Sequence, residues 1–277
     1  MATSMTTTTP EHLVAAQAGE LRRYADLTHA LAMREFVGRY RGNLAGGLSA
    51  IAVPLMMLAT YTFVFSVLLP GRVRPGHTAT DFGFFLFAGL VGWNLFAEVA
   101  SRSPRLFVDS AQYVRKPQFP ISALVAAPCL AGFYRSLPWA AAFAIAGFAL
   151  GEAPPATAWL TPLALLLTAL LTVGFGLAIA SLGVLIRDLS ELVPAALTLG
   201  FFLSPILYPT DVLTGVSPWL RTLNPIASHL TIVRGLLFDG TLPDPALMIE
   251  ATIWTVASLA LGITLYRATR TTLQDLL

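Results

Sequence analysis

The chain has 277 residues, of which 56% are hydrophobic and only 12% are charged, with a formal net charge of +2 and a mean hydropathy of +0.71. An ordinary soluble domain has ~25% charged residues, so this composition excludes one and indicates a single integral membrane domain. We expect an all-α fold and no nucleic-acid partner.

The first 20 residues are polar and rich in Thr and Ala, and they lack the basic start and apolar core of a secretory signal peptide. We therefore expect residues 1–20 to form a disordered cytoplasmic tail and residues 21–277 to form one transmembrane domain. Residues 21–45 place apolar side chains at helical spacing beside arginines, which is typical of a helix in the lipid interface. The apolar positions are Leu27, Leu31, Phe36 and Tyr40, and the basic ones are Arg34, Arg39 and Arg41.

Apolar runs bounded by charge, proline or glycine predict six transmembrane helices at residues 46–69, 82–100, 121–150, 158–186, 192–208 and 247–266. The third and fourth runs are longer than a bilayer requires, and the fifth is short and ends where Pro205 and Pro209 should break a helix. Residues 209–246 are too polar to span and too apolar for a free loop. We therefore expect short re-entrant helices there, on the outer side of the membrane.

The basic residues predict the orientation. With the N-terminus inside, twelve lie in cytoplasmic segments and four in outer ones, which favours two cytoplasmic termini under the positive-inside rule. The cytoplasmic set is Arg22, Arg23, Arg34, Arg39, Arg41, Arg102, Arg105, Arg115, Lys116, Arg187, Arg267 and Arg270, and the outer set is Arg72, Arg74, Arg221 and Arg234.

Several catalytic and nucleotide-binding motifs are missing. The sequence has no GxxxxGK[ST] phosphate-binding loop, no HExxH, no CxxC and no GxSxG. We therefore expect no metal site, no nucleophile site and no ATP hydrolysis by this chain. Its one cysteine, Cys129, lies among Ala and Leu and is expected to be a buried apolar residue. Glu98 and Glu250 lie near span ends, whereas a proton relay would need acidic residues nearer the midplane.

The cytoplasmic segment 101–120 has charged and apolar faces, which suits docking of a soluble partner. The residues concerned are Asp109, Tyr113, Arg115, Lys116 and Phe119. Its composition is equally compatible with a solvated positive-inside loop.

A series of short motifs runs along the chain. Before the first apolar run, Arg34, Glu35, Arg39 and Tyr40 fill an R-E-x-x-x-R-Y pattern. The later ones are the W-N pair Trp93 and Asn94, the segment YVRKPQFP at 113–120, the R-D pair Arg187 and Asp188, SPILYP at 204–209, and LNPIASHL at 223–230. In this order, over roughly residues 21–270, the chain resembles the permease subunits of ABC exporters of the O-antigen and teichoic-acid class.

The resemblance implies that two copies of this chain pair with two separate ATP-binding subunits, which bind ATP and Mg while this chain binds no cofactor. Arg34, Glu35, Arg39 and Tyr40 would belong to a cytoplasmic gate helix. Residues 109–120 would be the loop that docks on the ATPase and transmits its motion. The first and fifth spans would line the pathway, and the outer helices would close its far end.

Aromatic side chains are candidates for the pathway lining because sugars stack on aromatic rings, although aromatics more commonly pack cores or form interfacial belts. The candidates are Tyr61, Phe65, Trp93, Phe202 and Tyr208. Arg135 falls within the third run and needs pairing or hydration. It lies ~21 Å from residue 121 at ~1.5 Å per residue, whereas Glu98 is near the inner end of its run, so their levels do not obviously match. A lipid-headgroup contact, a pyrophosphate contact and a structural ion pair remain open for Arg135.

We expect the transmembrane subunit of an ATP-driven exporter of lipid-linked polysaccharide, in contact with membrane lipids of the bacterial cytoplasmic membrane. A permease for drugs or small lipids is the alternative within the same fold. An integral membrane lipid-modifying enzyme would need a buried acidic or histidine cluster, and a structural anchor protein would not stimulate a partner's ATPase.

Overall fold

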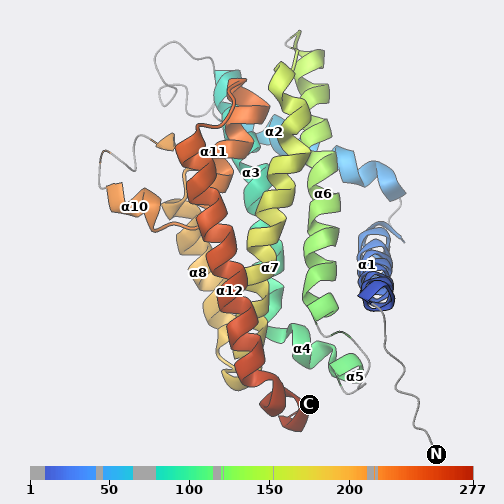
Figure 1. Ribbon diagram of the computed structural model, residues 1–277. Coiled ribbons are helices and arrows are strands. Elements are labelled where there is room, and N and C mark those ends of the chain that lie inside the picture. Colours follow the sequence, from blue (N-terminus) through green and yellow to red (C-terminus); the bar gives the residue numbers. More distant parts are fainter. Residues whose placement is uncertain are drawn as a thin grey trace, which may run out of the picture.

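The computed structural model describes residues 10–41, 46–64, 79–114, 120, 122–151, 153–210, 215 and 218–276. Every regular element in these ranges is a helix, and the longest helices form an upright bundle (Figure 1). The predicted all-α class is therefore confirmed for the described part of the chain.

Within the described ranges, three helices are long and apolar enough to cross a membrane: α3 (Ala79–Arg102), α7 (Thr161–Leu185) and α12 (Pro245–Leu276). The helix α6 (Ser122–Ala149) packs beside α3 and α7 and, at ~1.5 Å per residue, has the length to span. Its Arg135 and two internal prolines lower its apolar character. The chain is thus a multi-pass membrane protein.

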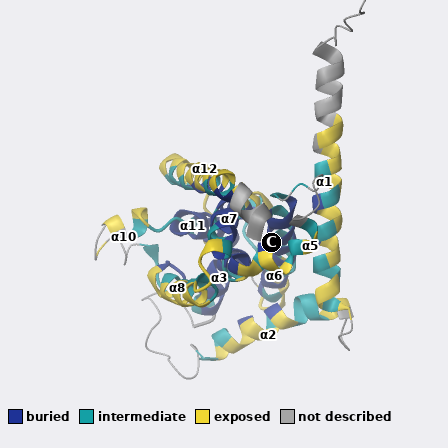
Figure 2. Cartoon of the chain, turned by 90° about the horizontal axis from the view of Figure 1, so that it is seen from below, coloured by how far each residue is buried: buried dark blue, intermediate teal, exposed yellow. Residues whose placement is uncertain are grey.

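The first predicted span differs from the structure. A short 3-10 turn, η1 (Gly46–Leu48), leads into α2 (Ser49–Phe63), and residues 65–69 lie outside the described ranges. Figures 1 and 2 show that α2 lies at a large angle to the axis of the bundle. It packs against α3 and α6, but its 15 residues bury only Pro54 and Leu58, so most of its side chains stay at least partly exposed.

The predicted interface helix is present as α1 (Pro10–Tyr40), which lies across the bundle axis against α6 (Figure 2). It begins at Pro10, so the tail predicted for residues 1–20 is helical from residue 10, and residues 1–9 lie outside the described ranges. Proline is favoured at the first helical position, and the alanines that follow favour helix. Among the α1 side chains that the structure describes, Thr28 and Ala32 are buried, and Ala32 packs on Ala127 and Ala131 of α6.

The central element is α3, which packs against α2, α6, α7, α8 (Leu189–Leu203) and α11 (Ala227–Arg234). Phe87 is fully buried and stacks on Trp139 of α6 at 5.2 Å between ring centroids. The helix α8 ends at Leu203, two residues before Pro205, because a residue preceding proline disfavours the helical conformation.

A seam of small residues joins α7 and α12. An added methyl group on Gly174 would lie 2.3 Å from the backbone carbon of Ser258, and one on Gly262 would lie 2.4 Å from the Gly174 carbonyl oxygen. Ser258 Oγ donates a hydrogen bond across the seam to the Leu171 carbonyl at 3.2 Å. Small residues allow such close backbone approach between membrane helices.

The predicted outer region contains α10 (Pro218–Thr222), α11 and the π-helix η5 (Gly235–Asp239). Arg234 was assigned to an outer segment, but it is only 3% exposed. It donates to the carbonyls of Pro205 and Ile206, and its guanidinium lies 3.8 Å from the Phe85 ring centroid. Arg221 of α10 pairs with Glu250 of α12. The contacts of Arg234 thus give the backbone carbonyls in the turn after α8 a hydrogen-bond donor within the protein.

The small-residue seam makes a prediction for Gly174→Ala. The added methyl group meets backbone atoms that cannot move independently, so we expect destabilisation on the order of 1–3 kcal/mol and a lower midpoint of thermal unfolding in detergent. Gly38→Ala is the matched control because nothing lies within 4 Å of the added carbon. An unchanged midpoint for Gly174→Ala would contradict the packing of this seam.

Candidate functional site

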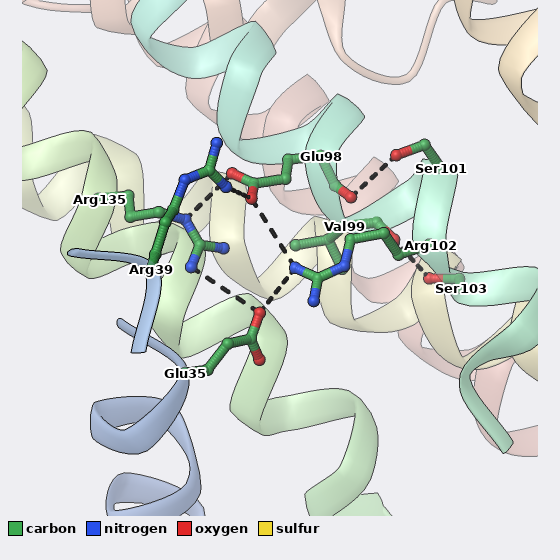
Figure 3. A network of polar contacts seen from close by, with 8 residues as sticks. All are labelled: Glu35, Arg39, Glu98, Val99, Ser101, Arg102, Ser103 and Arg135. Atoms are coloured by element: carbon green, nitrogen blue, oxygen red, sulfur yellow. Dashed lines mark hydrogen bonds and ion pairs between the residues drawn. The ribbon is translucent and has the colours of Figure 1, made fainter. Parts of the chain in front are cut away.

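Five charged side chains form an ionic network that joins α1, α3 and α6 (Figure 3). Arg135 Nε donates to Glu98 Oε2 at 3.0 Å, and Arg102 Nη1 donates to Glu35 Oε1 at 2.7 Å. Arg39 Nη1 donates to Glu98 Oε1. Two longer contacts of 3.8 Å join Arg135 to Glu35 and Arg102 to Glu98. The gate helix predicted from the sequence is therefore held to the bundle by charge as well as by packing.

The sequence suggested that Arg135 and Glu98 lie at different depths along the bundle axis, but their hydrogen bond shows that they lie at the same depth. The first turns of α6 extend beyond the end of α3, where Leu124 and Val125 pack against the buried Phe107 of the following segment. One turn before Arg135, a carbon added to Gly132 would lie 3.5 Å from Val99 Cγ2. The middle of α6 is therefore level with the last turns of α3, and a structural ion pair is established for Arg135.

Arg135 is the most buried member of the network at 6% exposure, and its Nη2 has no hydrogen-bond partner. Arg39 and Arg102 are more than half exposed, and the two glutamates are about a quarter exposed. Three arginines and two glutamates leave the network with a net charge of +1. Partial burial strengthens these interactions relative to surface ion pairs.

Two of the four predicted gate residues, Glu35 and Arg39, belong to this network, whereas Arg34 and Tyr40 lie outside it. Tyr40 contacts the Phe36 ring edge to face at 5.3 Å. The sequence analysis did not identify Glu98 and Arg102 as part of the site. The available signal was a repeated Glu-x-x-x-Arg spacing near the ends of two helices, at Glu35–Arg39 and Glu98–Arg102, since residues four apart share one helix face.

Two cavities flank the network. One has a volume of about 650 Å³ and lies among α1, α2, α3, α6 and α8, with Arg39, Tyr40, Tyr61, Glu98 and Arg135 in its wall. The other, of about 510 Å³, lies among α1, the segment after α3 and the start of α6, and Arg34, Glu35, Arg102 and Tyr113 are part of its lining. The network thus forms a partition between the two spaces.

The predicted docking loop begins with η3 (Ser103–Arg105), α4 (Leu106–Asp109) and α5 (Ala111–Val114). Phe107 is fully buried and anchors α4, whereas Asp109 is exposed and pairs with Arg105 at 3.9 Å. Tyr113 packs on the cluster around Phe107. The predicted docking residues Arg115, Lys116 and Phe119 lie outside the described residues.

A hollow of about 480 Å³ lies between this segment and the corner joining α7 to α8, with Arg105, Val108, Arg187 and Ser190 in its lining. The two parts touch closely, since a carbon added to Gly183 would lie 2.1 Å from the Pro104 carbonyl oxygen. Glycine at position 183 therefore permits direct backbone contact between α7 and η3.

The predicted aromatic residues are placed in different environments. Trp93 is 7% exposed and contacts Phe201 of α8 with ring centroids 5.8 Å apart, while Tyr61 packs beside this cluster. Phe202 is 58% exposed, and Tyr208 donates its hydroxyl to the Phe202 carbonyl at 2.5 Å. Phe65 lies outside the described ranges. Tyr61 also lines the larger cavity.

The described residues contain no group of three or more His, Cys, Asp or Glu side chains that could hold a metal ion. Cys129 is buried, in agreement with its expected role as a small apolar residue.

Comparison with known proteins gives a consistent set of similarities. Residues 26–238 match the family model described as ABC-2 type transporter. The chain is 30% identical to an O-antigen export system permease protein RfbA of Myxococcus xanthus over 230 residues, which cover 81% of this chain and 85% of the relative. Two proteins of the same name from Klebsiella pneumoniae are 28% and 29% identical, each over 78% of this chain and 82% of the relative.

The ionic network makes a prediction for Glu98→Gln. This change removes the carboxylate nearest to the buried Arg135, so we expect a loss of stability of up to about 3–5 kcal/mol, measured as thermal unfolding in detergent. Asp109→Asn is the matched control, because its exposed partner Arg105 contributes only ~0–1 kcal/mol.

The double variant Glu98→Gln/Arg135→Gln tests the pairing directly. It should lose less stability than the sum of the two single variants, because removal of both charges leaves neither one buried alone. Additive losses would contradict the pairing.

Proposed function

The chain belongs to the ABC-2 type transporter family and is a transport permease, and we propose that it is the transmembrane subunit of an ATP-driven exporter of lipid-linked polysaccharide. Similarity to O-antigen export permeases over about four fifths of the chain carries this proposal. The absence of a phosphate-binding loop in the sequence agrees with ATP hydrolysis on a separate subunit. That partner holds ATP and Mg, and this chain binds neither.

In this proposal the chain spans the bacterial cytoplasmic membrane six times with both termini in the cytoplasm. The end of α12, the α4–α5 segment and the corner between α7 and α8 lie at one end of the bundle (Figure 1). Arg105, Arg187, Arg267 and Arg270 are at that end, and such a concentration supports a cytoplasmic assignment. The short helices α10 and α11 then belong to the outer side, where α11 is buried in protein.

Two ATP-binding subunits dock on the cytoplasmic end, at the α4–α5 segment and the residues that follow it. Movement of that segment has two structural routes into the membrane domain. One is the backbone contact between Pro104 and Gly183, and the other is the Arg102 to Glu35 bond to the gate helix. Substrate enters from the inner leaflet near α1 and leaves on the outer face.

Two copies of the chain form the transport unit, with the pathway between them. The exposed apolar side chains of α2 and α8 support this arrangement, because a single chain leaves much of their apolar surface uncovered (Figure 2). They are Val53, Met56, Met57, Phe63, Leu192, Leu199, Phe202 and Leu203. Tyr61, Phe65, Phe202 and Tyr208 remain the proposed aromatic contacts of the glycan. Trp93 would support them from the core.

Deletion of the gene followed by complementation tests the function. We expect surface polysaccharide to disappear and polyprenyl-linked glycan to accumulate in the cytoplasm, because synthesis continues while export stops. Gel electrophoresis of surface glycan and mass spectrometry of extracted lipid-linked glycan are the measurements. Normal surface glycan without an accumulated intermediate would instead favour a permease for drugs or small lipids.

A charge reversal at Arg115 and Lys116 tests the docking loop. Arg115→Glu with Lys116→Glu should reduce copurification of the ATP-binding subunit and the ATPase activity of the complex, while the amount of protein in the membrane stays the same. Arg267→Glu with Arg270→Glu is the control, since it reverses two charges at the same end of the bundle outside the loop. Equal effects of both pairs would argue for bulk charge instead of docking.

A further inference from the structure

The cavity of about 650 Å³ beside the ionic network changes chemical character along its length. Along α3 its lining passes from Ser101 and Glu98 through Leu95 and the uncharged Asn94 to Val91 and Leu90, a distance of ~16 Å at ~1.5 Å per residue. On α6 it likewise passes from the buried Arg135 to Trp139 one turn later. The cavity therefore has a charged end at α1 and an apolar end beside α2.

The charged end carries excess positive charge. Both oxygens of Glu98 are occupied, Oε1 by Arg39 and Oε2 by Arg135, so this carboxylate is neutralised within the network. Glu35 is shared between Arg102 and Arg135, which leaves one positive charge unbalanced. Glu98 and Arg135 line the cavity together with Arg39.

The donors of Arg135 exceed the acceptors that surround it. Its Nε and Nη1 face the two glutamates, whereas the buried Nη2 has no partner. A buried donor without an acceptor is unfavourable, and few such groups persist in folded proteins without a ligand, ion or water. A guanidinium prefers the paired oxygens of a carboxylate or phosphate, and the nearby carboxylates are already engaged.

We propose that this cavity binds the phosphate head of a lipid, with Arg39 and Arg135 holding the phosphate oxygens and the hydrocarbon chain lying against Met57, Leu90 and Trp139. The volume falls within the range of ligand sites, and such sites combine apolar walls with a few convergent polar groups. The phosphate also balances the remaining positive charge of the network.

Two sources of this chemistry exist in the membrane. One is an ordinary anionic phospholipid, and the other is the diphosphate of a polyprenyl-linked glycan, an assignment that rests on the proposed function. Because Arg39 lies on α1, a bound phosphate would strengthen the contact between the gate helix and the bundle in either case.

The test is a binding measurement on the complex of the full chain with its ATP-binding subunit, purified and delipidated in detergent. Phosphatidylglycerol and polyprenyl diphosphate are the probes, and diacylglycerol and polyprenol are their uncharged counterparts. Native mass spectrometry and the shift in thermal unfolding midpoint report binding. We expect at least one phosphate lipid to bind and both uncharged lipids to bind at least about tenfold more weakly.

Three variants locate the site. Arg135→Gln and Arg39→Gln should each weaken binding of the phosphate lipid at least about tenfold. Arg267→Gln, the control for charge at an exposed position of α12, should bind as the unchanged chain does. If Arg135→Gln does not fold, Arg39→Gln decides the matter, because Arg39 is 57% exposed and Arg135 keeps both glutamate partners without it.

The outcomes separate the lipid site from the transport proposal. Binding of phosphatidylglycerol alone supports a site for a membrane phospholipid, and competition by polyprenyl diphosphate supports a site for the lipid carrier. Equal binding of charged and uncharged lipids, or unchanged binding by Arg39→Gln, would overturn the phosphate site. Loss of polysaccharide export is measured separately in the deleted strain and does not depend on this binding.

Discussion

The buried guanidinium of Arg135 is the constraint that organises the part of this protein where α1, α3 and α6 meet. A charge in a membrane domain must be paired, and the two carboxylates that pair it come from different helices, Glu98 on α3 and Glu35 on α1. Separation of α1 from the bundle would therefore remove Glu35, one of the two carboxylates that pair with Arg135. The network thus adds charge pairing to the packing of α1 on α6, which rests on the cluster around Ala32 and on the edge contact of Phe36 with Tyr134.

The same network reaches the segment that follows α3. Arg102 is the last residue of α3, and it bonds to Glu35 immediately before η3 and α4 begin. On the opposite side η3 contacts α7 through backbone atoms, because position 183 carries no side chain. A displacement of the α4 segment would thus reach α1 through charge and α7 through contact. Both connections are direct, one through the hydrogen bond from Arg102 to Glu35 and the other through backbone atoms.

Sequence reasoning identified the elements better than their arrangement. Apolar runs located α3, α7 and α12, and the spacing of Leu27, Leu31, Phe36 and Tyr40 identified α1, because both signals are local. The sequence did not predict how α6 is aligned with α3. The depth of Arg135 along the bundle axis depends on how far α6 extends past α3 to pack on Phe107. That offset is set by tertiary contacts. Residues 10–20 were assigned to a tail because Thr and Ala content was given more weight than helix propensity.

Inclined α2 and exposed α8 share a physical origin. Each has 15 residues, and in one chain α2 buries only two of them while α8 buries none. Lipid tails and apolar side chains compete on similar terms for such exposed helix faces, so the surfaces of α2 and α8 can be covered by either. The larger cavity lies between these partly exposed helices and the buried α3 and α6. Its charged end is fixed by the ion pairs of Arg135, whereas much of its opposite wall comes from α2, which buries only two residues.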